Sequence, residues 1–510
     1  MLSQINSCGL IGLNGFMVKV ETDIGNGLPR FDIVGLPDAS VKEARDRVHA
    51  AVKNAGFGFP ARKIIVNLAP ASMKKVGAAY DLPIAVSILA ASNQLPDDKL
   101  SKAVFIGELS LDGGVCPVNG VLPMVIHAYS EGYREFFIPA ENAAEAAAVD
   151  GAVVYPVKNL KDIHAHFCTN AQIEQFVCTN EMYNSNNVDT LLDFCEVKGQ
   201  DTAKRALEIA AAGNHNVILI GPPGTGKTML AQRIPGILPD LTLDESLEVT
   251  KIHSIAGILP TGGALISTRP FRSPHHSVSA SGLTGGGTIP HPGELSLAHN
   301  GVLFLDELPE FRRDVLEAMR QPLEDGVVTI SRVNATLSYP CNIMLIASMN
   351  PCKCGYFGDS KHRCTCSATQ IDSYRSKISG PLLDRIDIQV EVSSVDYSDL
   401  STTEQGESSA VIKERVNNAR QLQKERYKDL PIHSNAQLSA GQLEEFCRVG
   451  EREHKILENA FNRLGLSARA YSRILKVSRT IADLEGERDI NGTHIAEAIQ
   501  YRSLDRKYFE

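Results

Sequence analysis

Hydrophobic and polar positions follow two periods along this chain, and the two alternate. Short apolar or alternating runs predict strands, whereas apolar residues three or four positions apart predict helices. In the first third of the chain, strands are predicted at 16–22, 30–36, 63–70, 103–110 and 135–140, and helices at 40–56, 81–92 and 124–132. This alternation predicts one compact α+β domain over residues 1–168.

The rest of the chain divides into three parts. Residues 169–190 are polar, rich in asparagine and without a clear period, which is typical of a linker. A second α/β region with continuously apolar strands covers 191–398, and such strands are typical of a parallel sheet. From 399 to 510 the apolar residues repeat at helical spacing. We therefore expect an α/β protein with an α+β domain, a parallel-sheet core and an all-α C-terminal domain.

A glycine-rich sequence joins a strand of the second region to a helix. The apolar run 216–220 leads directly into Gly221-Pro222-Pro223-Gly224-Thr225-Gly226-Lys227-Thr228. In such a loop the glycines let backbone N–H groups surround phosphates, the lysine reaches the β- and γ-phosphates, and the threonine ligates Mg²⁺. A glycine-rich turn without a ligand is the alternative, but the flanking strand and helix favour a site for ATP and Mg²⁺.

Two carboxylates and one amide follow further apolar strands. Asp306 and Glu307 end the run that begins at 301, and Asn350 ends the run 343–350. Together with a phosphate loop, this pattern predicts that Asp306 holds Mg²⁺, that Glu307 orients the attacking water, and that Asn350 positions water or senses the γ-phosphate. Taken alone, such acids commonly begin a solvated helix, and such an asparagine commonly forms a turn.

Composition limits the kinds of binding partner and the cell compartment that can be expected for this protein. The chain has 51 Lys and Arg against 60 Asp and Glu, a net charge of −9, so binding to nucleic acid has to come from local basic groups. The sequence has no run of 18 apolar residues. Its first residues lack the basic and apolar segments of a secretory leader, so we expect no secretion. Its 11 cysteines favour reduced thiols or a metal site. We expect a cytoplasmic protein that does not associate with membranes.

Four of the cysteines lie close together in the sequence: Cys352, Cys354, Cys364 and Cys366. Their spacing, C-x-C-x9-C-x-C, can present four thiolates to a tetrahedral Zn²⁺ ion. The C-x-C pair is less typical of zinc than C-x-x-C, His362 is an alternative ligand, and free thiols are the alternative to a metal site. Because the cluster follows Asn350-Pro351, we expect it to stiffen a loop beside the nucleotide site.

The order of these motifs resembles that of AAA+ ATPases. After the phosphate loop, the Leu-Asp-Glu strand and the strand ending in asparagine comes the segment Gly-Pro-Leu-Leu-Asp-Arg-Ile-Asp at 380–387. The resemblance implies that Arg385 reaches the nucleotide of a neighbouring subunit and stabilises transition-state charge there. A surface ion pair with Asp384 or Asp387 is the alternative.

Ser-Ala-Arg at 467–469 resembles the beginning of the sensor-2 lid helix in the same superfamily. This resemblance implies a contact between Arg469 and nucleotide, in its own subunit or in a neighbour. The alternative is a helix face that is only solvated, or that binds DNA, formed by four basic residues: Arg469, Arg473, Lys476 and Arg479.

Two insertions resemble those of the clade that holds magnesium chelatase motor subunits and MCM helicases. Residues 269–301 are rich in Gly, Ser and His and too polar for a core, which predicts an extended loop, and 327–337 alternate like a β-hairpin with its tip near 332–335. In that clade both insertions enter the pore of a ring. The resemblance therefore suggests residues that grip a nucleic-acid backbone: Arg269, Arg272, His275, His276, Arg332 and Asn334. Structural turns and subunit contacts are the alternative.

Residues 16–160 resemble the Lon-protease-like domain. The segments 75–82 and 119–124 match the places where that domain carries its nucleophile and its lysine. The serine falls on Ala79, or on Asp81 if a gap is allowed, and the lysine falls on Met124. Because peptidase chemistry needs a nucleophile and a base, we expect no proteolysis.

Across nearly the whole chain, the order of domains and motifs resembles the YifB/ComM family of Mg-chelatase-like proteins. The segments that carry the resemblance are 269–277, 350–356 and 380–388. The family implies a ring hexamer that hydrolyses ATP and migrates DNA branches, on single-stranded or branched DNA, during recombination in natural transformation. A protein-remodelling AAA+ ATPase and a metal-insertion motor like magnesium chelatase are the alternatives.

Overall fold

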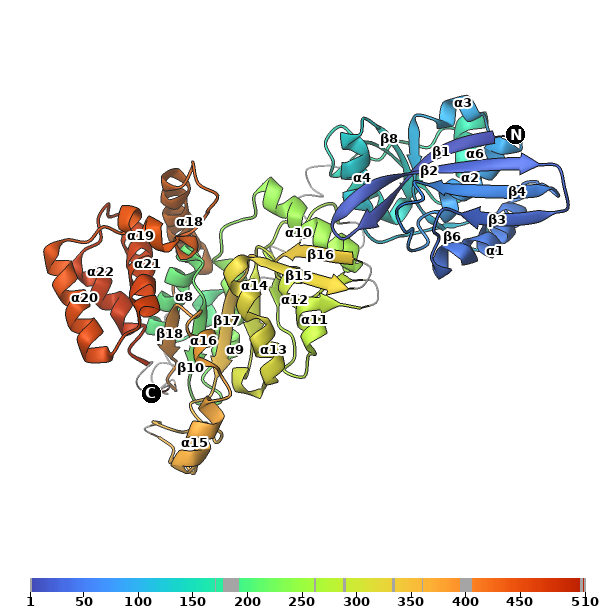
Figure 1. Ribbon diagram of the computed structural model, residues 1–510. Coiled ribbons are helices and arrows are strands. Elements are labelled where there is room, and N and C mark those ends of the chain that lie inside the picture. The colour runs from blue at the N-terminus through green and yellow to red at the C-terminus, as the bar shows by residue number, and fades with distance from the viewer. Residues whose placement is uncertain are drawn as a thin grey trace. The chain divides into compact units, whose positions relative to one another are not determined.

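The computed structural model describes residues 2–169, 171–177, 192–260, 263–287, 290–332, 335–359, 361–394, 406–504 and 508 (Figure 1). Contacts divide the chain into two units. The first unit contains Met1–Asn186 and Thr242–Ser267, and the second contains Asn187–Leu241 and Thr268–Glu510. Each unit has a sheet and a hydrophobic core of its own.

A seven-stranded mixed sheet forms the first unit, in the order β3-β4-β2-β1-β5-β8-β9. Its strands are β1 (Leu2–Ile11), β2 (Asn14–Gly25), β3 (Arg30–Val34), β4 (Lys63–Ala69), β5 (Ala103–Phe105), β8 (Glu135–Pro139) and β9 (Val153–Val157). Strands β1 and β2 pair antiparallel over the whole length of β1, whereas β5, β8 and β9 are parallel. Buried residues alternate along β2, which is the pattern that predicts a strand.

Helices of the first unit pack against this sheet and contribute to its two cores. The main ones are α1 (Ala39–Asn54), α2 (Asp81–Ala91), α4 (Val121–Ser130) and α6 (Leu160–Cys168), with the shorter α3 (Asp97–Leu100), α5 (Ala143–Ala147) and the small hairpin of β6 (Glu108–Leu109) and β7 (Val115–Cys116). The Asp38 side chain caps α1 by accepting a hydrogen bond from the Val41 N–H at 2.8 Å. The predicted α+β class of this region is confirmed.

Strand β1 is a strand that the hydrophobic pattern does not predict. Ser3, Asn6 and Ser7 are polar, yet all three are buried in the middle of the sheet. The Ser3 hydroxyl donates to Asp97 at 2.5 Å, and the Asn6 amide donates to the Ser101 carbonyl at 2.8 Å. Buried polar groups are tolerated when they have such partners, and the partners of Ser3 and Asn6 lie far along the chain.

Helix α10 (Leu243–Ala256) belongs to the first unit, although it follows the phosphate loop in sequence. The Ser254 hydroxyl donates to the buried Glu145 carboxylate at 2.6 Å, and the Ser254 carbonyl accepts from the Gly120 N–H at 3.1 Å. Leu122 and Leu265 share a small apolar cluster beside these contacts. The sequence-based division placed 242–267 within 191–398; the packing of α10 against α4 places this segment with the first unit.

The second unit is built on a five-stranded sheet in the order β11-β14-β17-β10-β18, all parallel. Its strands are β10 (Val217–Ile220), β11 (Phe271–Arg272), β14 (Val302–Leu305), β17 (Met344–Met349) and β18 (Ile388–Glu391). All residues of β10, β14 and β17 are buried. The predicted parallel sheet is confirmed.

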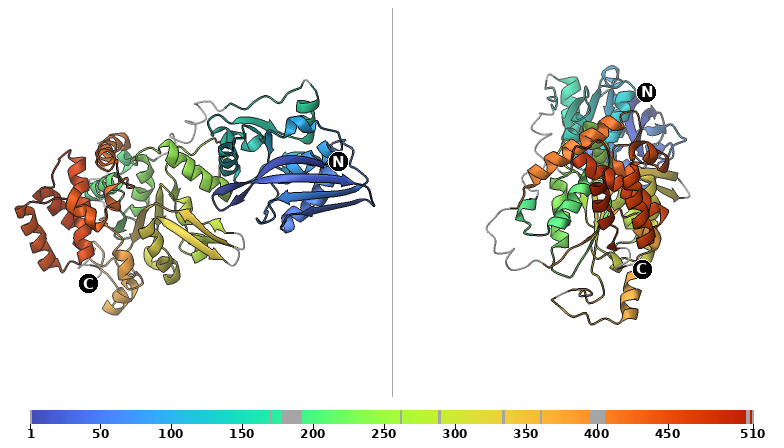
Figure 2. Two further views of the ribbon diagram at one scale, coloured as in Figure 1. Left: turned by 45° about the horizontal axis from the view of Figure 1, so that its top comes forward. Right: turned by 90° about the vertical axis from the view of Figure 1, so that its left-hand side faces the viewer.

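Two groups of helices accompany this sheet. In chain order, α8 (Asp201–Gly213) precedes the strands. Between the strands come α9 (Lys227–Arg233), α11 (Ala280–Thr284), α12 (Glu294–Leu297), α13 (Arg313–Ala318), α14 (Arg320–Asp325), α15 (Ala368–Arg375) and α16 (Gly380–Leu383). The last hundred residues form a bundle of helices, as predicted: α18 (Ser409–Arg426), α19 (Ala440–Phe446), α20 (Glu451–Leu464), α21 (Ala468–Leu484) and α22 (Gly492–Gln500) (Figure 2). One hydrophobic core extends from the sheet through α8 into this bundle.

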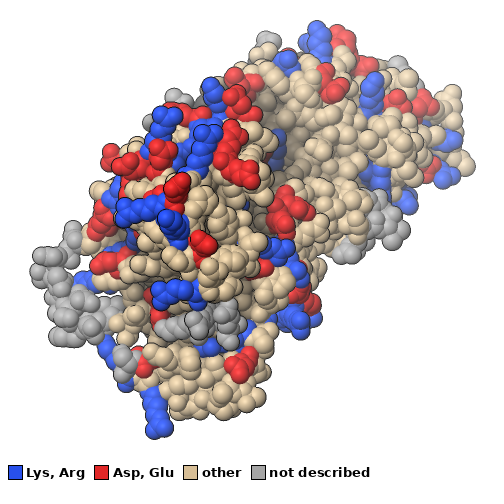
Figure 3. All heavy atoms as spheres, turned by 60° about the vertical axis from the view of Figure 1, so that its left-hand side comes forward, with Lys and Arg blue, Asp and Glu red and all other residues tan. Residues whose placement is uncertain are grey.

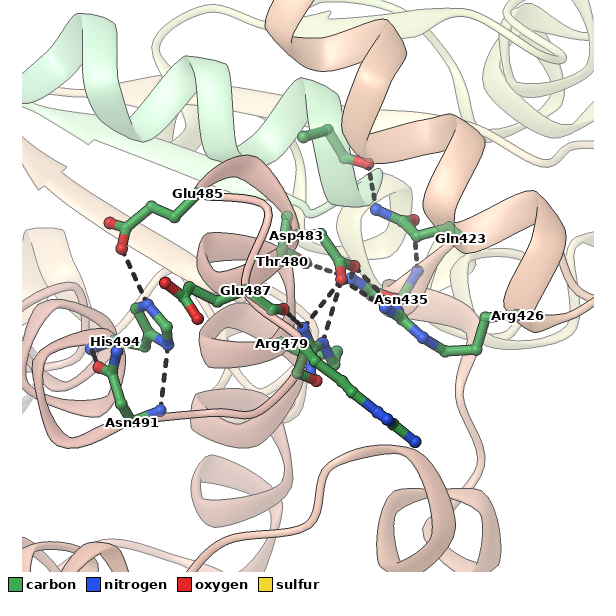
Figure 4. A network of polar contacts seen from close by, with 12 residues as sticks. Gln423, Arg426, Asn435, Arg479, Thr480, Asp483, Glu485, Glu487, Asn491 and His494 are labelled. Atoms are coloured by element: carbon green, nitrogen blue, oxygen red, sulfur yellow. Dashed lines mark hydrogen bonds and ion pairs between the residues drawn. The ribbon is translucent and has the colours of Figure 1, made fainter.

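A buried polar network inside the bundle surrounds Asp483 (Figure 4). Its carboxylate accepts hydrogen bonds from Arg426 at 2.9 Å, Asn435 at 2.8 Å and Arg479 at 3.1 Å. Arg479 is only 3% exposed. The alternative of a solvated or DNA-binding face is therefore wrong for Arg479.

The segment 269–301 is more ordered and more buried than its composition suggests. It contains β11, α11, α12 and the short pair β12 (Gly285–Gly286) and β13 (His291–Pro292). Leu295 and Ala298 are fully buried, and His299 and Asn300 nearly so. The prediction that this whole stretch is too polar for the core is wrong, because its end packs directly before β14.

The second insertion forms the predicted hairpin, of β15 (Val327–Arg332) and β16 (Ala335–Pro340). The hairpin is a sheet of its own, separate from the five parallel strands.

Among the helices of the described residues, none combines the length and the apolar character needed to cross a bilayer.

Candidate nucleotide-binding site

The phosphate loop, residues 221–228, leaves the carboxyl end of β10 and leads into α9. Gly224 and Gly226 have φ angles of +79° and +86°, which glycine adopts without strain. A Cβ on Gly221 would lie 2.2 Å from the Val392 carbonyl oxygen, so only glycine allows this approach. The backbone therefore requires glycine at these positions. Residues in the left-handed conformation help to turn backbone N–H groups inward, which suits a phosphate-binding loop.

Lys227 lies within the loop and is 9% exposed. Its ammonium group donates to the carbonyls of Gly221 and Pro222, both at 2.8 Å, and to the Asn350 side-chain oxygen at 3.2 Å. Burial lowers the pKa of Lys227 to about 8, although Asp306 and Glu307 act in the opposite direction. Lys227 is thus a buried donor whose pKa lies closer to neutral pH than that of an exposed lysine. It contacts Asn350, which the sequence predicted as a site residue.

We expect the affinity for ATP to fall as the pH rises from 7 to 9. Only protonated Lys227 attracts phosphate, and with a pKa of about 8 most of it is neutral at pH 9. Binding of ATP then requires uptake of a proton, so the dissociation constant should rise about tenfold over this range. Titration with a fluorescent ATP analogue measures this change.

The matched control is Lys227→Arg, because arginine keeps its charge at every pH of the experiment. Its affinity is expected to be lower overall but to change little between pH 7 and 9. A wild-type dissociation constant that is the same at both pH values would contradict the role given to the Lys227 charge.

Asp306 follows β14 and faces the threonine of the phosphate loop. The Thr228 hydroxyl donates to one carboxylate oxygen of Asp306 at 2.8 Å, and the Ser348 hydroxyl donates to the other. A hydroxyl and a carboxylate side by side are ligands that Mg²⁺ prefers. Ser348 was missed from the sequence; its only signal is a single hydroxyl within the otherwise apolar run 343–349.

The backbone of Glu307 leaves the extended conformation of β14. Its φ angle is +53°, which is rare for a residue other than glycine and is found most often at functional sites. Its N–H donates to Asp306 at 3.0 Å and to Ser348 at 3.3 Å, while its side chain is 56% exposed. The Nδ1 atom of His276 lies 3.9 Å from the carboxylate. The carboxylate is therefore placed beside the phosphate loop and is accessible to water.

Arg385 lies at the amino-terminal end of β10, whereas the phosphate loop lies at the carboxyl end of this strand. The Arg385 carbonyl accepts from Asn216 at 2.8 Å, and Asn216 precedes β10, whereas the phosphate loop follows β10. Five residues of extended strand separate these two ends by about 16 Å. The guanidinium group is held by the carbonyls of Arg320 at 2.9 Å and Pro381 at 2.7 Å, and by Glu324. The ion pair expected as the alternative, with Asp384 or Asp387, is not the one that forms.

A cavity of about 830 Å³ opens beside Arg385. Arg469 lines it, is 65% exposed and pairs with Asp384 at 3.0 Å. No residue of the phosphate loop lines this cavity. The two arginines are thus brought together at one surface, away from the nucleotide loop of their own chain.

Two basic residues behind Arg469 are held inside the unit. Arg473 pairs with Asp387 at 3.1 Å, and Lys476 donates to the Ala436 carbonyl at 2.8 Å. Burial alone would raise the pKa of Asp387, but Arg473 and His215 hold it below its usual value. The alternative of a free basic face is therefore wrong for Arg473 and Lys476, and of the four basic residues only Arg469 is mainly exposed.

The four clustered cysteines converge. The sulfur atoms of Cys352, Cys354, Cys364 and Cys366 all lie within 4.8 Å of one another and form no disulfide. Three of the distances are 3.3, 3.6 and 3.7 Å, close to the separation of about 3.8 Å that a tetrahedral ion with metal–sulfur bonds of about 2.3 Å requires. His362 is 63% exposed and contacts Asp359 at 3.0 Å, outside the set of four sulfurs.

The residues suggested for gripping a polymer lie in different surroundings. Arg269 donates to the carbonyls of Pro239 and Asn300, and Arg272 forms a two-pronged ion pair with Glu294 at 2.7 and 2.9 Å. The ring of His275 lies against that of His276, with centroids 4.0 Å apart and a tilt of 35°, beside Glu307. The side chain of Arg332 and the whole of Asn334 lie outside the described residues.

Comparison with known proteins adds the family. The pattern described as "Magnesium chelatase, subunit ChlI" matches residues 193–400, "Subunit ChlI of Mg-chelatase" matches 20–142, and "Magnesium chelatase, subunit ChlI C-terminal" matches 406–502. The competence protein ComM of Haemophilus influenzae is 45% identical over 510 residues, 99% of this chain and 98% of that protein. The chain belongs to the YifB/ComM family of Mg-chelatase-like proteins.

Other relatives are consistent with this assignment. YifB of Escherichia coli is 43% identical over 506 residues, 99% of this chain and 98% of that protein. The magnesium-chelatase 67 kDa subunit of Chlorobaculum tepidum is 26% identical over 165 residues, 32% of this chain and 24% of that subunit. As a YifB/ComM protein with a Mg-chelatase-type AAA+ region, the chain is an AAA+ ATPase, and this class uses ATP and Mg²⁺.

Proposed function

We propose that this protein is a ring-forming cytoplasmic motor that couples ATP hydrolysis to movement along DNA, as in branch migration. The observation that carries the proposal is the separation of Lys227 and Arg385 by the length of β10. A hydrolysis site that needs both is complete only between two subunits, which favours a closed ring such as a hexamer. The similarity to a competence protein supports DNA as the substrate.

In this proposal each residue has one task. Lys227 draws the β- and γ-phosphates into the loop, Glu307 orients the attacking water, and Asn350 holds the far side of the γ-phosphate. Mg²⁺, held by Thr228 and Asp306, would neutralise phosphate charge. Arg385 from the next subunit stabilises the charge that develops in the transition state, and Arg469 approaches the same nucleotide from the same surface.

Contact with DNA is proposed at the hairpin of β15 and β16. Hydroxyl pairs lie across its exposed face, Thr329 with Ser338 and Ser331 with Thr336. Such groups bind phosphate oxygens without reading sequence. On the face shown in Figure 3, Lys and Arg are interspersed with Asp and Glu, so that face offers no broad basic surface to DNA. Local contacts at the hairpin fit this distribution better, and Arg332 and Asn334 remain the candidates that the sequence suggested for them.

The test is the rate of ATP hydrolysis with and without forked DNA, together with a branch-migration assay. Forked DNA should raise the rate severalfold, and Lys227→Ala should abolish both hydrolysis and strand movement. Replacing Ser331 and Thr336 by alanine should reduce the stimulation by DNA but leave the rate without DNA unchanged. Stimulation by unfolded protein and by no DNA would instead support a protein-remodelling motor.

Two alternatives are retained from the sequence. A protein-remodelling motor usually grips its substrate with an aromatic pore loop, which neither insertion provides, and a chelatase motor needs partner subunits.

The places of the Lon nucleophile hold Ala79, which is buried, and Asp81, which is bound by Arg47 at 2.7 Å. We propose that the first unit has no peptidase activity and serves as a scaffold.

We also propose that the four cysteines bind one Zn²⁺ ion. Four convergent sulfurs without a disulfide are the donor set of structural zinc sites. Metal analysis of the purified protein should show about one equivalent of zinc, lost in Cys352→Ser combined with Cys364→Ser.

A further inference from the structure

The loop that carries the cysteines makes direct contact with the phosphate loop. Gly355 lies between Cys354 and the second pair of cysteines, and a Cβ on it would lie 2.6 Å from Cδ and 3.2 Å from Cγ of Pro223. Pro223 is the third residue of the phosphate loop. Since no side chain fits between them, the position of one loop limits the position of the other.

A second path joins the same loop to the nucleotide site. Pro351 and Cys352 follow Asn350 directly, and Asn350 accepts a hydrogen bond from Lys227 at 3.2 Å. The Pro351 carbonyl accepts from Arg375 at 3.2 Å, and Arg375 also lies over the ring of Phe357, with 4.7 Å between guanidinium and ring centre. The cysteine loop therefore borders both the loop that receives phosphate and the asparagine that faces its lysine.

Little regular structure holds this loop in place. Within its described residues, 351–359 and 361–366, it contains no helix and no strand, and the part of the chain with α15 projects from the body of the second unit (Figures 1 and 2). Its backbone turns are closed by the Gly355 N–H to the Cys352 carbonyl at 3.0 Å and the Asp359 N–H to the Tyr356 carbonyl at 3.2 Å. The set of four sulfurs joins its beginning to its end. His362 adds a second link, through Asp359 at 3.0 Å and the ring of Tyr356 at 4.8 Å between centroids.

We infer that a metal ion bound by the four cysteines holds Gly355 against Pro223, and that its occupancy thereby sets the affinity of the phosphate loop for nucleotide. This inference rests on the zinc site proposed above. With the ion bound, the loop is closed and supports the phosphate loop and Asn350 from one side. When the ion is removed, the two ends of the loop separate, the support is lost, and ATP binds more weakly.

Two glycines of this loop provide a matched pair of variants. Gly355 and Gly358 have similar left-handed φ angles of +89° and +79°, so alanine strains the backbone equally at both. A Cβ at 358 meets nothing within 4 Å, whereas a Cβ at 355 meets Pro223. With equal zinc contents, Gly355→Ala should weaken binding of a fluorescent ATP analogue about tenfold, since small displacements in a binding site have effects of this order. Gly358→Ala should bind as the wild type does.

Removal of the metal tests the same inference in the unaltered chain. Treatment with a zinc chelator should raise the dissociation constant of the ATP analogue, and added Zn²⁺ should restore it, with zinc content measured by atomic emission in each sample. A preparation that never contains zinc would overturn the zinc site and the coupling together. One equivalent of zinc with an ATP affinity that chelation does not change would overturn the coupling alone. If Gly355→Ala fails to fold, the chelation experiment decides.

Discussion

Replacing Glu307 by glutamine is expected to lower the rate of ATP hydrolysis by about 10²–10⁴, the usual contribution of a residue that directs proton transfer. The amide keeps the size of the side chain but can no longer attract a proton from water. The carboxylate is 56% exposed and lies next to the phosphate loop without a strong ion pair, so its loss should not disturb folding. ATP binding should be retained, because Lys227 and its partners are unchanged. Steady-state hydrolysis and binding of the ATP analogue measure the two effects separately.

Glu310→Gln is the matched control for this substitution. It removes the same charge three residues away, where the carboxylate is 42% exposed and pairs with Lys377 at 3.3 Å. Its hydrolysis rate should stay within about twofold of the wild type, as is usual for exposed ion pairs. Equal losses in Glu307→Gln and Glu310→Gln would show that Glu307 has no specific part in hydrolysis.

Arg385→Ala and Lys227→Ala are each expected to be inactive alone and to regain activity when mixed. Removal of an arginine that acts across an interface costs about 10³ or more in rate. In a mixed ring, a site formed by the phosphate loop of an Arg385→Ala subunit and the arginine of a Lys227→Ala subunit has all its residues. About a quarter of the interfaces in a random mixture are of this kind, so mixing should restore a measurable fraction of the wild-type rate.

Arg312→Ala serves as the control, because Arg312 is 69% exposed and pairs with its chain neighbour Asp314 at 2.8 Å. It should hydrolyse ATP at the wild-type rate and add nothing when mixed with Lys227→Ala. If the mixture of Arg385→Ala and Lys227→Ala stayed inactive while size measurements showed mixed rings, Arg385 would not act across the interface. Activity restored in the mixture also shows that both variants fold.

Most elements of the nucleotide site follow from local signals. The loop at 221–228, the acids after β14 and the asparagine after β17 each stand at the end of an apolar run, and parallel strands bring these ends to one edge of a sheet. Their meeting was therefore predictable from sequence. Ser348 was not, because one hydroxyl in a buried strand gives no local signal, and its partner Asp306 is 42 residues away.

The basic residues show the reverse case. The sequence gives four arginines the appearance of exposed cations: Arg269, Arg272, Arg473 and Arg479. Each is engaged by a carbonyl or a carboxylate at least four residues away, and the partner of Arg473 is more than eighty residues away. A long polar side chain can be paired inside a unit or solvated outside it, and the pattern of neighbours along the chain is the same in both cases. Only the positions of partners in space distinguish them.

The sequence by itself determined the nucleotide loop, its acidic residues, the helical end of the chain and the family, because each depends on short spacings or on continuous similarity. The tertiary structure decided that α10 joins the first unit and that Gly355 touches Pro223. It also decided that Arg385 and Arg469 line one cavity, at the end of β10 that lies away from Lys227. These features depend on contacts between segments far apart in the chain. Such contacts are set by packing in three dimensions, which the order of residues along one strand or helix does not reveal.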